Sequence, residues 1–161
     1  MTYNDIALIR LNGLAETVLN NHDVPVMPVC LPAPYYGSEE TKVKEFVVIG
    51  WGKADENQRF EDIIKIGVGN RLPKKITLPL YDKSVCWNIF PGVDDTHICA
   101  GGERGKDSCN GDSGGPLVDK TEPMTLYGVV SAGSFQCATG QPGIYTRVDH
   151  FIDWIKNNLR D

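Results

Sequence analysis

One stretch constrains this chain more than any other, because it sets a serine among three glycines: Gly111-Asp112-Ser113-Gly114-Gly115-Pro116. Glycines leave the backbone uncovered, so its N–H groups can point at whatever the serine hydroxyl attacks. Pro116 ends this loop, and Leu117 begins an apolar run that predicts a strand. Ser, Gly and Asp also favour turns, so a serine between glycines is by itself equally compatible with an ordinary turn.

The composition indicates a globular chain. With 161 residues, 41% of them apolar and 23% charged, it can form one ordinary domain with a sizeable core. The formal net charge of −5 argues against a general nucleic-acid binder. No apolar run approaches the roughly 20 residues of a transmembrane helix, so no membrane partner is expected.

The cysteines indicate an oxidising compartment. They are Cys30, Cys86, Cys99, Cys109 and Cys137. No Cys-x-x-Cys pair occurs and only three histidines are present, so neither a structural zinc site nor any other metal or cofactor is expected. Two disulfides with one spare cysteine fit a secreted protein, whereas buried free thiols are the alternative. Because the first residues lack the features of a signal peptide, we expect the beginning of the protein to lie outside this chain.

Short apolar stretches separated by glycine-rich turns predict an antiparallel β-barrel. The expected strands cover residues 5–11, 46–52, 63–68, 74–80, 116–118, 126–131 and 143–147. Residues 24–32 alternate prolines with apolar residues, which excludes a helix and predicts an extended connector. Residues 96–101 are expected to form a loop, with His97 on the surface near the serine.

Two helices are predicted. Residues 82–90 favour a short helix with Asp82 as its N-cap. Residues 149–159 favour a longer helix, because apolar residues recur at helical spacing and Asp149 can cap the first turn. His150 is expected at the surface near its start.

The string Gly-Asp-Ser-Gly-Gly-Pro at 111–116 resembles the nucleophile loop of the chymotrypsin-like (trypsin-type) serine endopeptidases. Asn-Asp-Ile-Ala-Leu-Ile at 4–9 is similar to the family segment that carries the acid of the Ser-His-Asp triad. The resemblance covers nearly the whole chain but only the later part of the family's catalytic domain. It implies an all-β, trypsin-like double β-barrel with most of the first barrel missing and a C-terminal α-helix.

This resemblance divides the chain into three parts. Residues 1–44 would be the remnant of the first barrel and the connector between barrels. Residues 45–148 would form the second β-barrel, with the nucleophile and the specificity pocket. Residues 149–161 would hold the C-terminal helix. Without most of the first barrel, the second barrel would expose an apolar face, so we expect the isolated chain to aggregate or to be molten.

The resemblance also implies catalytic roles. Ser113 would be the nucleophile and Asp5 the acid that orients the base, while the backbone N–H groups of Gly111 and Ser113 would form the oxyanion hole. The alternative for Asp5 is a surface acid at the head of a strand.

The histidine base is not found where the family has it. It should precede the acid, yet only four residues precede Asp5 and none is histidine. The resemblance places His22, His97 and His150 elsewhere, and triad geometry tolerates displacements of only about an ångström. We therefore expect the chain alone to be inactive.

The resemblance implies a specificity pocket for basic side chains. Asp107 would lie at its floor and pair with a substrate arginine or lysine, with Gly133 and Gly143 as its walls. Ser131 and Gly133 would bind the substrate backbone as an added strand. Ala132 departs from the family's usual aromatic residue, which weakens the apolar wall beside the pocket. A solvated loop acid is the alternative for Asp107.

Two further features follow from the resemblance. Asp112 would pair with the new N-terminal amine made by zymogen cleavage, and a turn acid is its alternative. Cys30 would bond to a segment absent from this chain, or remain an unpaired thiol. The implied disulfides are Cys86–Cys99 and Cys109–Cys137.

The resemblance predicts a secreted, trypsin-like serine endopeptidase made as a zymogen. Its partners would be protein or peptide substrates with Arg or Lys before the cleaved bond, the missing N-terminal segment, and serpin-type inhibitors. The spare cysteine and the loops suggest the arthropod clip-domain group of proteases. A non-catalytic protease homologue that acts as a binding or regulatory module is the alternative.

Overall fold

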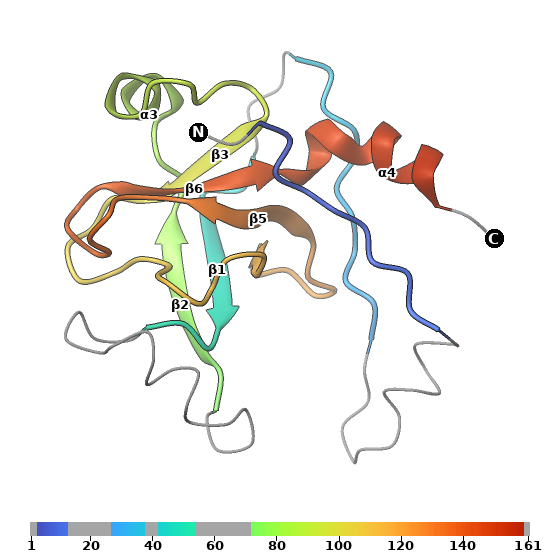
Figure 1. The fold of residues 1–161 in the computed structure, drawn as a ribbon, viewed down its shortest axis with the longest axis horizontal. Helices are drawn as coiled ribbons and strands as arrows, with labels where there is room; N and C mark the ends of the chain where they lie inside the picture. The colour runs from blue at the N-terminus through green and yellow to red at the C-terminus, as the bar shows by residue number, and fades with distance from the viewer. Residues whose placement is uncertain (1–2, 13–26, 38–41, 54–71, 160–161) are drawn as a thin grey trace.

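The computed structural model describes residues 3–12, 27–37, 42–53 and 72–159. Its strands are β1 (Glu45–Gly50), β2 (Lys74–Pro79), β3 (His97–Gly101), β4 (Pro116–Val118), β5 (Leu126–Ala132) and β6 (Pro142–Arg147). Its helices are α3 (Lys83–Ile89), the 3-10 helix η2 (Val148–Phe151) and α4 (Ile152–Asn158). The fold is therefore mostly β with a C-terminal helix, as predicted (Figure 1).

The six strands form one antiparallel sheet in the order β2-β1-β4-β5-β6-β3. The two ends of this order meet again, because Leu80 pairs with Ala100 and the Tyr81 N–H donates to the Cys99 carbonyl at 2.8 Å. This contact closes the sheet into a barrel. Pro79 ends β2, where a missing N–H is tolerated at the sheet edge.

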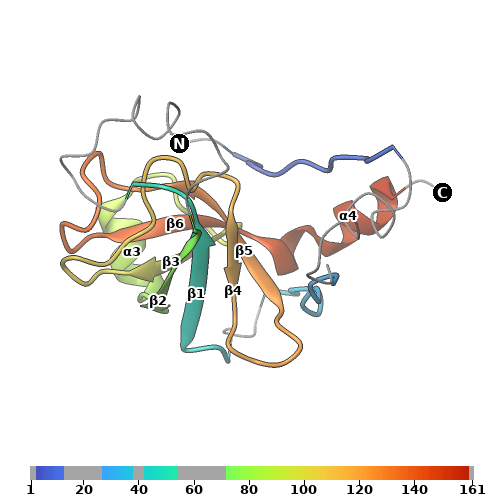
Figure 2. The ribbon, with the colours of Figure 1, turned by 90° about the horizontal axis from the view of Figure 1, so that it is seen from below.

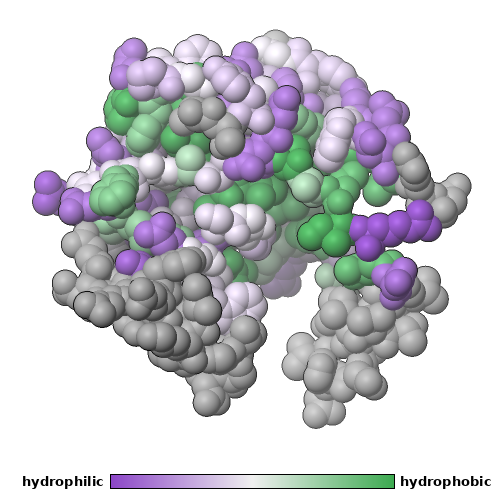
Figure 3. All heavy atoms as spheres, in the orientation of Figure 1, coloured by the Kyte–Doolittle hydropathy of each residue, from purple (hydrophilic) through white to green (hydrophobic). Residues whose placement is uncertain are grey.

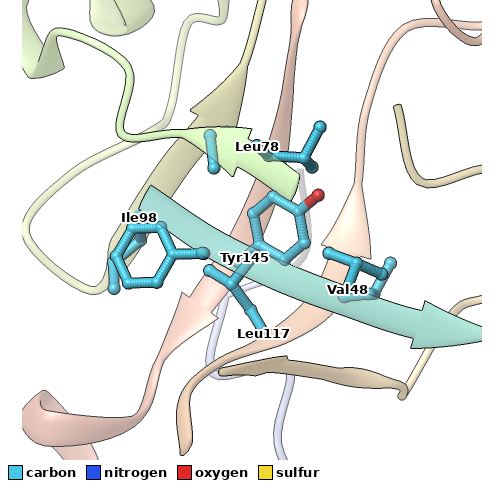
Figure 4. Close-up of a cluster of buried hydrophobic side chains, with 8 residues drawn as sticks. Val48, Leu78, Ile98, Leu117 and Tyr145 are labelled. Atoms are coloured by element: carbon cyan, nitrogen blue, oxygen red, sulfur yellow. The ribbon is translucent and has the colours of Figure 1, made fainter. Parts of the chain in front are cut away.

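The barrel core is filled by one side-chain cluster to which every strand contributes (Figure 4). Its members are Phe46, Val48, Leu78, Ile98, Ala100, Leu117, Val130 and Tyr145. Phe46 and Val48 reach it because alternate residues of a strand share one face, and Phe46 lies opposite Leu78 in the β1–β2 register. The Tyr145 ring lies near the centre of this cluster, with its hydroxyl at one end.

Strand β3 was not predicted. All five of its residues are buried, and His97 pairs with Thr146 at the start of the β3–β6 register. Because both faces are covered, the segment shows no alternation of apolar and polar residues. The expectation of a surface His97 is wrong: it is 5% exposed, and its Nδ1 lies 3.0 Å from Asp94 Oδ1.

Both predicted helices form at the predicted positions, but only one of the two predicted N-caps is observed. Asp82 caps α3, since its Oδ1 accepts from the Val85 N–H at 3.0 Å. Asp149 does not cap the C-terminal helix, which begins as η2 instead. Asp149 Oδ1 accepts from Arg147 Nε at 2.7 Å, because the buried guanidinium needs a carboxylate partner.

The N-terminal run 3–12 is extended but is not a strand, contrary to prediction. It pairs with none of the strands in the described part of the chain, and β5 and β6 hydrogen-bond to it through the Ser131 and Thr146 hydroxyls at Asp5. Figure 2 shows the run, in blue, passing apart from the sheet toward α4. Ile9 is 86% exposed and Leu11 54%, and Figure 3 shows apolar surface on this side of the molecule.

The remaining predictions concern the segment 63–68, the connector and membrane-spanning helices. The expected strand at 63–68 falls outside the described residues. The described part of the connector is extended, with the Cys30 N–H donating to the Met124 carbonyl at 3.0 Å and the Leu126 N–H to the Cys30 carbonyl at 2.8 Å. Among the described residues, no helix has the length and apolar character needed to cross a membrane.

Candidate active site

The serine loop is joined to β5 directly after the exposed Ser113 and is closed by a hydrogen bond within the loop. The Gly114 N–H donates to the Val130 carbonyl of β5 at 2.9 Å, and the Gly115 N–H to the Asp112 carbonyl at 2.8 Å. Gly114 has a φ of +79°, and a Cβ on Gly115 would lie 2.7 Å from the Asp112 oxygen. The glycines are therefore required by this turn, which presents the serine hydroxyl to solvent.

Two backbone N–H groups beside Ser113 remain available. In the part of the chain that the structure describes, no hydrogen bond joins the backbone N–H of Gly111 or Ser113 to another backbone group. Gly111 has a φ of +99°, which favours glycine there. Such a pair of N–H groups beside a nucleophile can stabilise a negatively charged oxygen.

Asp112 turns away from the cavity that holds Ser113. Its Oδ1 accepts from the Gly52 N–H at 2.8 Å, and its Oδ2 from the Cys109 N–H at 3.0 Å. A Cβ on Gly50 would lie 2.1 Å from Asp112 Oδ1, so the Gly-Trp-Gly corner leaves room for this carboxylate. Asp112 also lines a second cavity of about 320 Å³, together with Lys53, Lys74 and Lys75.

Ser113 shares a cavity of about 540 Å³ with a buried carboxylate. Asp107 Oδ2 accepts from the Ala138 N–H at 3.0 Å, whereas its Oδ1 is buried and has no hydrogen-bond partner. Burial raises the pKa of Asp107 above its ordinary value. A carboxylate oxygen left unpaired in a cavity is suited to receive a cationic ligand, which would supply the missing charge and hydrogen bonds.

The walls of this cavity lack side chains where a long ligand would pass. A Cβ on Gly133 would lie 3.9 Å from Gly143 Cα, so the two glycines face each other. A Cβ on Gly143 would lie 3.0 Å from the Tyr145 hydroxyl and 3.2 Å from Asp107 Oδ1. Any larger residue at Gly143 would therefore narrow the approach to Asp107.

Sequence reasoning missed a hydroxyl pair formed by Ser108, which lines the cavity, and the fully buried Tyr145. Ser108 Oγ lies 2.9 Å from the Tyr145 hydroxyl, next to Asp107. Burial raises the pKa of Tyr145, so this phenol stays neutral. Gly143 and Tyr145 are two residues apart and share one face of β6, but no sequence pattern indicates the contact of Tyr145 with Ser108.

Asp5 contacts strands β5 and β6, although it lies far from both in the sequence. The Ser131 hydroxyl donates to Asp5 Oδ2 at 2.6 Å, and the Thr146 hydroxyl donates to the Asp5 carbonyl at 2.8 Å. Ser131 lines the cavity together with Ser113. The predicted acid is thus hydrogen-bonded to a residue that lines the cavity of the predicted nucleophile.

Neither described histidine lines the Ser113 cavity. His97 lines a separate cavity of about 300 Å³ next to Arg147. His150 is exposed, as predicted, and its ring packs edge-on against Phe151 at a centroid distance of 5.0 Å. His22 lies outside the described residues.

Two disulfides brace the site and the barrel. Cys109–Cys137 ties the serine loop to the segment that carries Gly133, with a Cα–Cα distance of 5.6 Å. Cys86–Cys99 ties α3 to β3, with a Cα–Cα distance of 6.5 Å. Cys30 is half-buried and forms no disulfide within the described residues.

Replacing both Cys109 and Cys137 with serine is expected to lower the free energy of unfolding by about 2–4 kcal/mol. It should also weaken binding of a guanidinium ligand, because the Ala138 N–H that holds Asp107 follows directly after Cys137. The matched control replaces Cys86 and Cys99, which should cost stability but spare binding. Denaturant titration and ligand titration check both effects, and equal loss of binding in the two variants would contradict the expectation.

Comparison with known proteins identifies relatives over most of the chain. The family model described as Trypsin matches residues 1–155. Phenoloxidase-activating factor 1 of Holotrichia diomphalia is 38% identical over 98% of this chain and 40% of its own length. The CLIP domain-containing serine protease HP8 of Bombyx mori is 40% identical over 97% of this chain and 41% of its own length. Trypsin-1 of Astacus astacus is 39% identical over 96% of this chain and 60% of its own length.

A solved structure is similar as well. Neuropsin, a serine protease expressed in the limbic system of mouse brain, superposes with a TM-score of 0.65 at 29% sequence identity. The match covers 84% of this chain and 55% of neuropsin. The chain therefore spans about half of the length of the proteins it matches.

Proposed function

Since this chain belongs to the trypsin family of serine proteases, we propose that the protein containing it cleaves peptide bonds after arginine or lysine. The observation that carries the proposal is the unpaired Asp107 oxygen, buried in the cavity that also holds Ser113. A guanidinium or ammonium group of the substrate would pair with this oxygen. The Ser108 hydroxyl, which lines the same cavity and contacts the Tyr145 hydroxyl, would offer a further hydrogen bond.

Ser113 would attack the carbonyl carbon of the substrate, and the N–H groups of Gly111 and Ser113 would stabilise the resulting oxyanion. The serine proton would pass to a histidine and then to the leaving amine, after which water would hydrolyse the acyl-enzyme. Asp5 would orient that histidine, with the Ser131 hydroxyl holding its carboxylate in place. Supporting these roles is Ser131, which lines the cavity together with Ser113 and donates its hydroxyl to Asp5.

The histidine would come from a part of the protein outside these 161 residues. Support for this comes from His97 and His150, which do not line the Ser113 cavity, and from relatives whose lengths the chain only partly spans. Residues 1–44 would then complete a first barrel together with that part, residues 45–148 would be the second barrel, and 149–161 the terminal helix.

Substrate would bind as an added antiparallel strand along the end of β5, at Ser131 and Gly133. Gly133 and Gly143 would leave the passage to Asp107 open.

The relatives also suggest how the protein is made and controlled. Asp112 would receive the amine freed by zymogen cleavage in the cavity that it lines. Cys30 would bond to a segment outside the chain. The protein would be secreted, as the two disulfides and the clip-domain relatives suggest, and serpin-type inhibitors would act on it.

A second function is favoured by one observation: no described histidine lines the Ser113 cavity. If the complete protein also lacks a base there, the chain would be a non-catalytic homologue that binds basic segments of a partner. The intact Asp107, Gly111 and Ser113 argue for the enzyme, because binding alone needs no nucleophile or oxyanion hole.

The test is hydrolysis by the complete, activated protein of matched peptide amides that end in Arg, Lys, Phe or Glu. We expect turnover of the Arg and Lys amides only, and loss of about 10⁶ in kcat when Ser113 is replaced with alanine. A fluorophosphonate should label the native protein but not the Ser113→Ala variant. Absence of both turnover and labelling would favour the non-catalytic homologue, and turnover of the Phe or Glu amide would contradict the assigned specificity.

A further inference from the structure

Phe135 stands exposed at the rim of the cavity that holds Asp107 and Ser113. Its side chain is 99% exposed, more than that of any other large apolar residue described. Single exposed apolar residues are common on protein surfaces, so exposure alone means little. What distinguishes Phe135 is that it lines the candidate substrate cavity and sits on a braced segment.

The contacts that hold this segment in place begin at Cys137, two residues after Phe135. Cys137 is bonded to Cys109 of the serine loop, and the next residue, Ala138, donates its N–H to Asp107 Oδ2 at 3.0 Å. The Gly105 N–H donates to the Ala138 carbonyl at 2.9 Å. An aromatic ring with two side-chain torsions, presented on a braced segment, loses little entropy when a ligand packs on it.

The direction of an added substrate strand places one side chain near Phe135. This step rests on the proposed function, in which the basic residue lies opposite Ser131 and reaches Asp107. In an antiparallel pair, residues further back in the substrate lie opposite residues further on in the chain. The substrate residue two positions before the basic one therefore lies opposite Gly133, and Phe135 follows along the same edge.

Strand geometry also selects which substrate side chain meets the ring. Alternate residues of a strand share a face and lie roughly 6.5 Å apart along it. The residue two positions before the basic one thus points to the same side as the side chain in the Asp107 cavity. Ala132, Gly133 and Ser134 are small, so no bulky side chain stands between that position and Phe135.

We propose that Phe135 determines specificity for an apolar or aromatic side chain two positions before the cleaved arginine or lysine. Ala132 presents only a methyl group at the rim, so the apolar surface offered to upstream substrate residues comes from the Phe135 ring. Packing of two such side chains removes apolar area of both from water, which a glycine or a charged residue at that substrate position cannot do.

The test measures binding, so that it does not depend on turnover. Fluorescent peptides of the form Xaa-Ala-Arg, with Xaa as Phe, Leu, Gly or Glu, are titrated into the complete protein carrying Ser113→Ala. We expect the Phe peptide to bind about threefold to tenfold more tightly than the Gly peptide. Adding Phe135→Ala should abolish that ratio and leave the Gly peptide's affinity unchanged, while Phe135→Trp should keep the ratio. The matched control is Met124→Ala, which removes an exposed apolar side chain that does not line the cavity and should change nothing.

The outcomes separate this inference from the proposed function. Peptide binding that Asp107→Asn abolishes, with a Phe-to-Gly ratio that Phe135→Ala leaves intact, would overturn the role of Phe135 alone. Equal weakening of all four peptides by Phe135→Ala would also overturn it, because that result indicates a structural effect on the loop. If no peptide binds, or if Asp107→Asn does not weaken peptide binding, both the proposed function and this inference fail.

Discussion

The Asp107→Asn variant of the complete protein is expected to lose roughly 10²- to 10⁴-fold in kcat/KM toward arginine amides. The substrate guanidinium would be desolvated in the cavity, and removing one partner of a buried ion pair costs about 3–5 kcal/mol. Asp107 Oδ1 has no partner within the described chain, so the carboxylate is free to pair with the substrate. Asparagine keeps an acceptor for the Ala138 N–H but removes the charge.

The same variant should be no less stable than the native protein when no ligand is bound. Burial raises the pKa of Asp107, so the folded protein holds the ionised form at a cost that is present at neutral pH and disappears as the pH falls. Asparagine avoids that cost. Thermal melts therefore separate lost recognition from lost folding.

The raised pKa of Asp107 also predicts how binding varies with pH. The free protein should lose affinity for a guanidinium ligand as the pH falls through the raised pKa, and so at a higher pH than an ordinary aspartate would allow. The matched control is Glu103→Gln, which removes an exposed acid paired with Lys106 at 2.7 Å outside the cavity. Unchanged arginine kinetics in Asp107→Asn, or an equal loss in Glu103→Gln, would contradict the role of Asp107.

Local sequence patterns were sufficient to predict most strands of the barrel. The predicted strands at 46–52, 74–80, 116–118, 126–131 and 143–147 correspond to β1, β2, β4, β5 and β6. Strand β3 was missed because it is buried on both faces and ends in Gly101, so it carries no alternation.

Errors arose where packing in the folded chain decides what a residue does. Asp149 has the sequence context of a helix cap, but the buried Arg147 takes its carboxylate. Residues 5–11 have the composition of a strand, yet they form no backbone pairing with any of the described strands. Such outcomes depend on tertiary packing, which overrides local preference.

The candidate site also combines features that adjacent residues predict with features that they do not. Ser113 and its glycines stand in one short motif, so the loop could be predicted from adjacent residues. The contact between Asp5 and Ser131 joins residues that are 126 apart in sequence, and no local pattern indicates it. Ser108 and Tyr145 meet across 37 residues, and Phe135 gains significance only through the cavity that it lines.

The 161-residue chain expressed alone is expected to hydrolyse arginine amides about 10⁶-fold more slowly than the complete activated protein. The physical reason is that a serine hydroxyl is a weak nucleophile at neutral pH unless a base removes its proton. Asp5 and Ser113 would both be present, but an acid that orients a base has no effect without one. The chain should also melt broadly, because Ile9 and Leu11 expose apolar surface that a folded partner would cover.

The measurement compares the isolated chain with the same chain co-expressed with the remainder of the protein, and a Ser113→Ala chain is the control for contaminating protease. Turnover should appear only when the remainder supplies a histidine, and should vanish again when that histidine is replaced. Robust turnover by the isolated chain, lost in Ser113→Ala, would contradict the expectation and place the base among its own histidines. His22→Gln, His97→Gln and His150→Gln would then identify it, and His97 would be the least accessible of the described pair because its imidazole is buried beside Asp94.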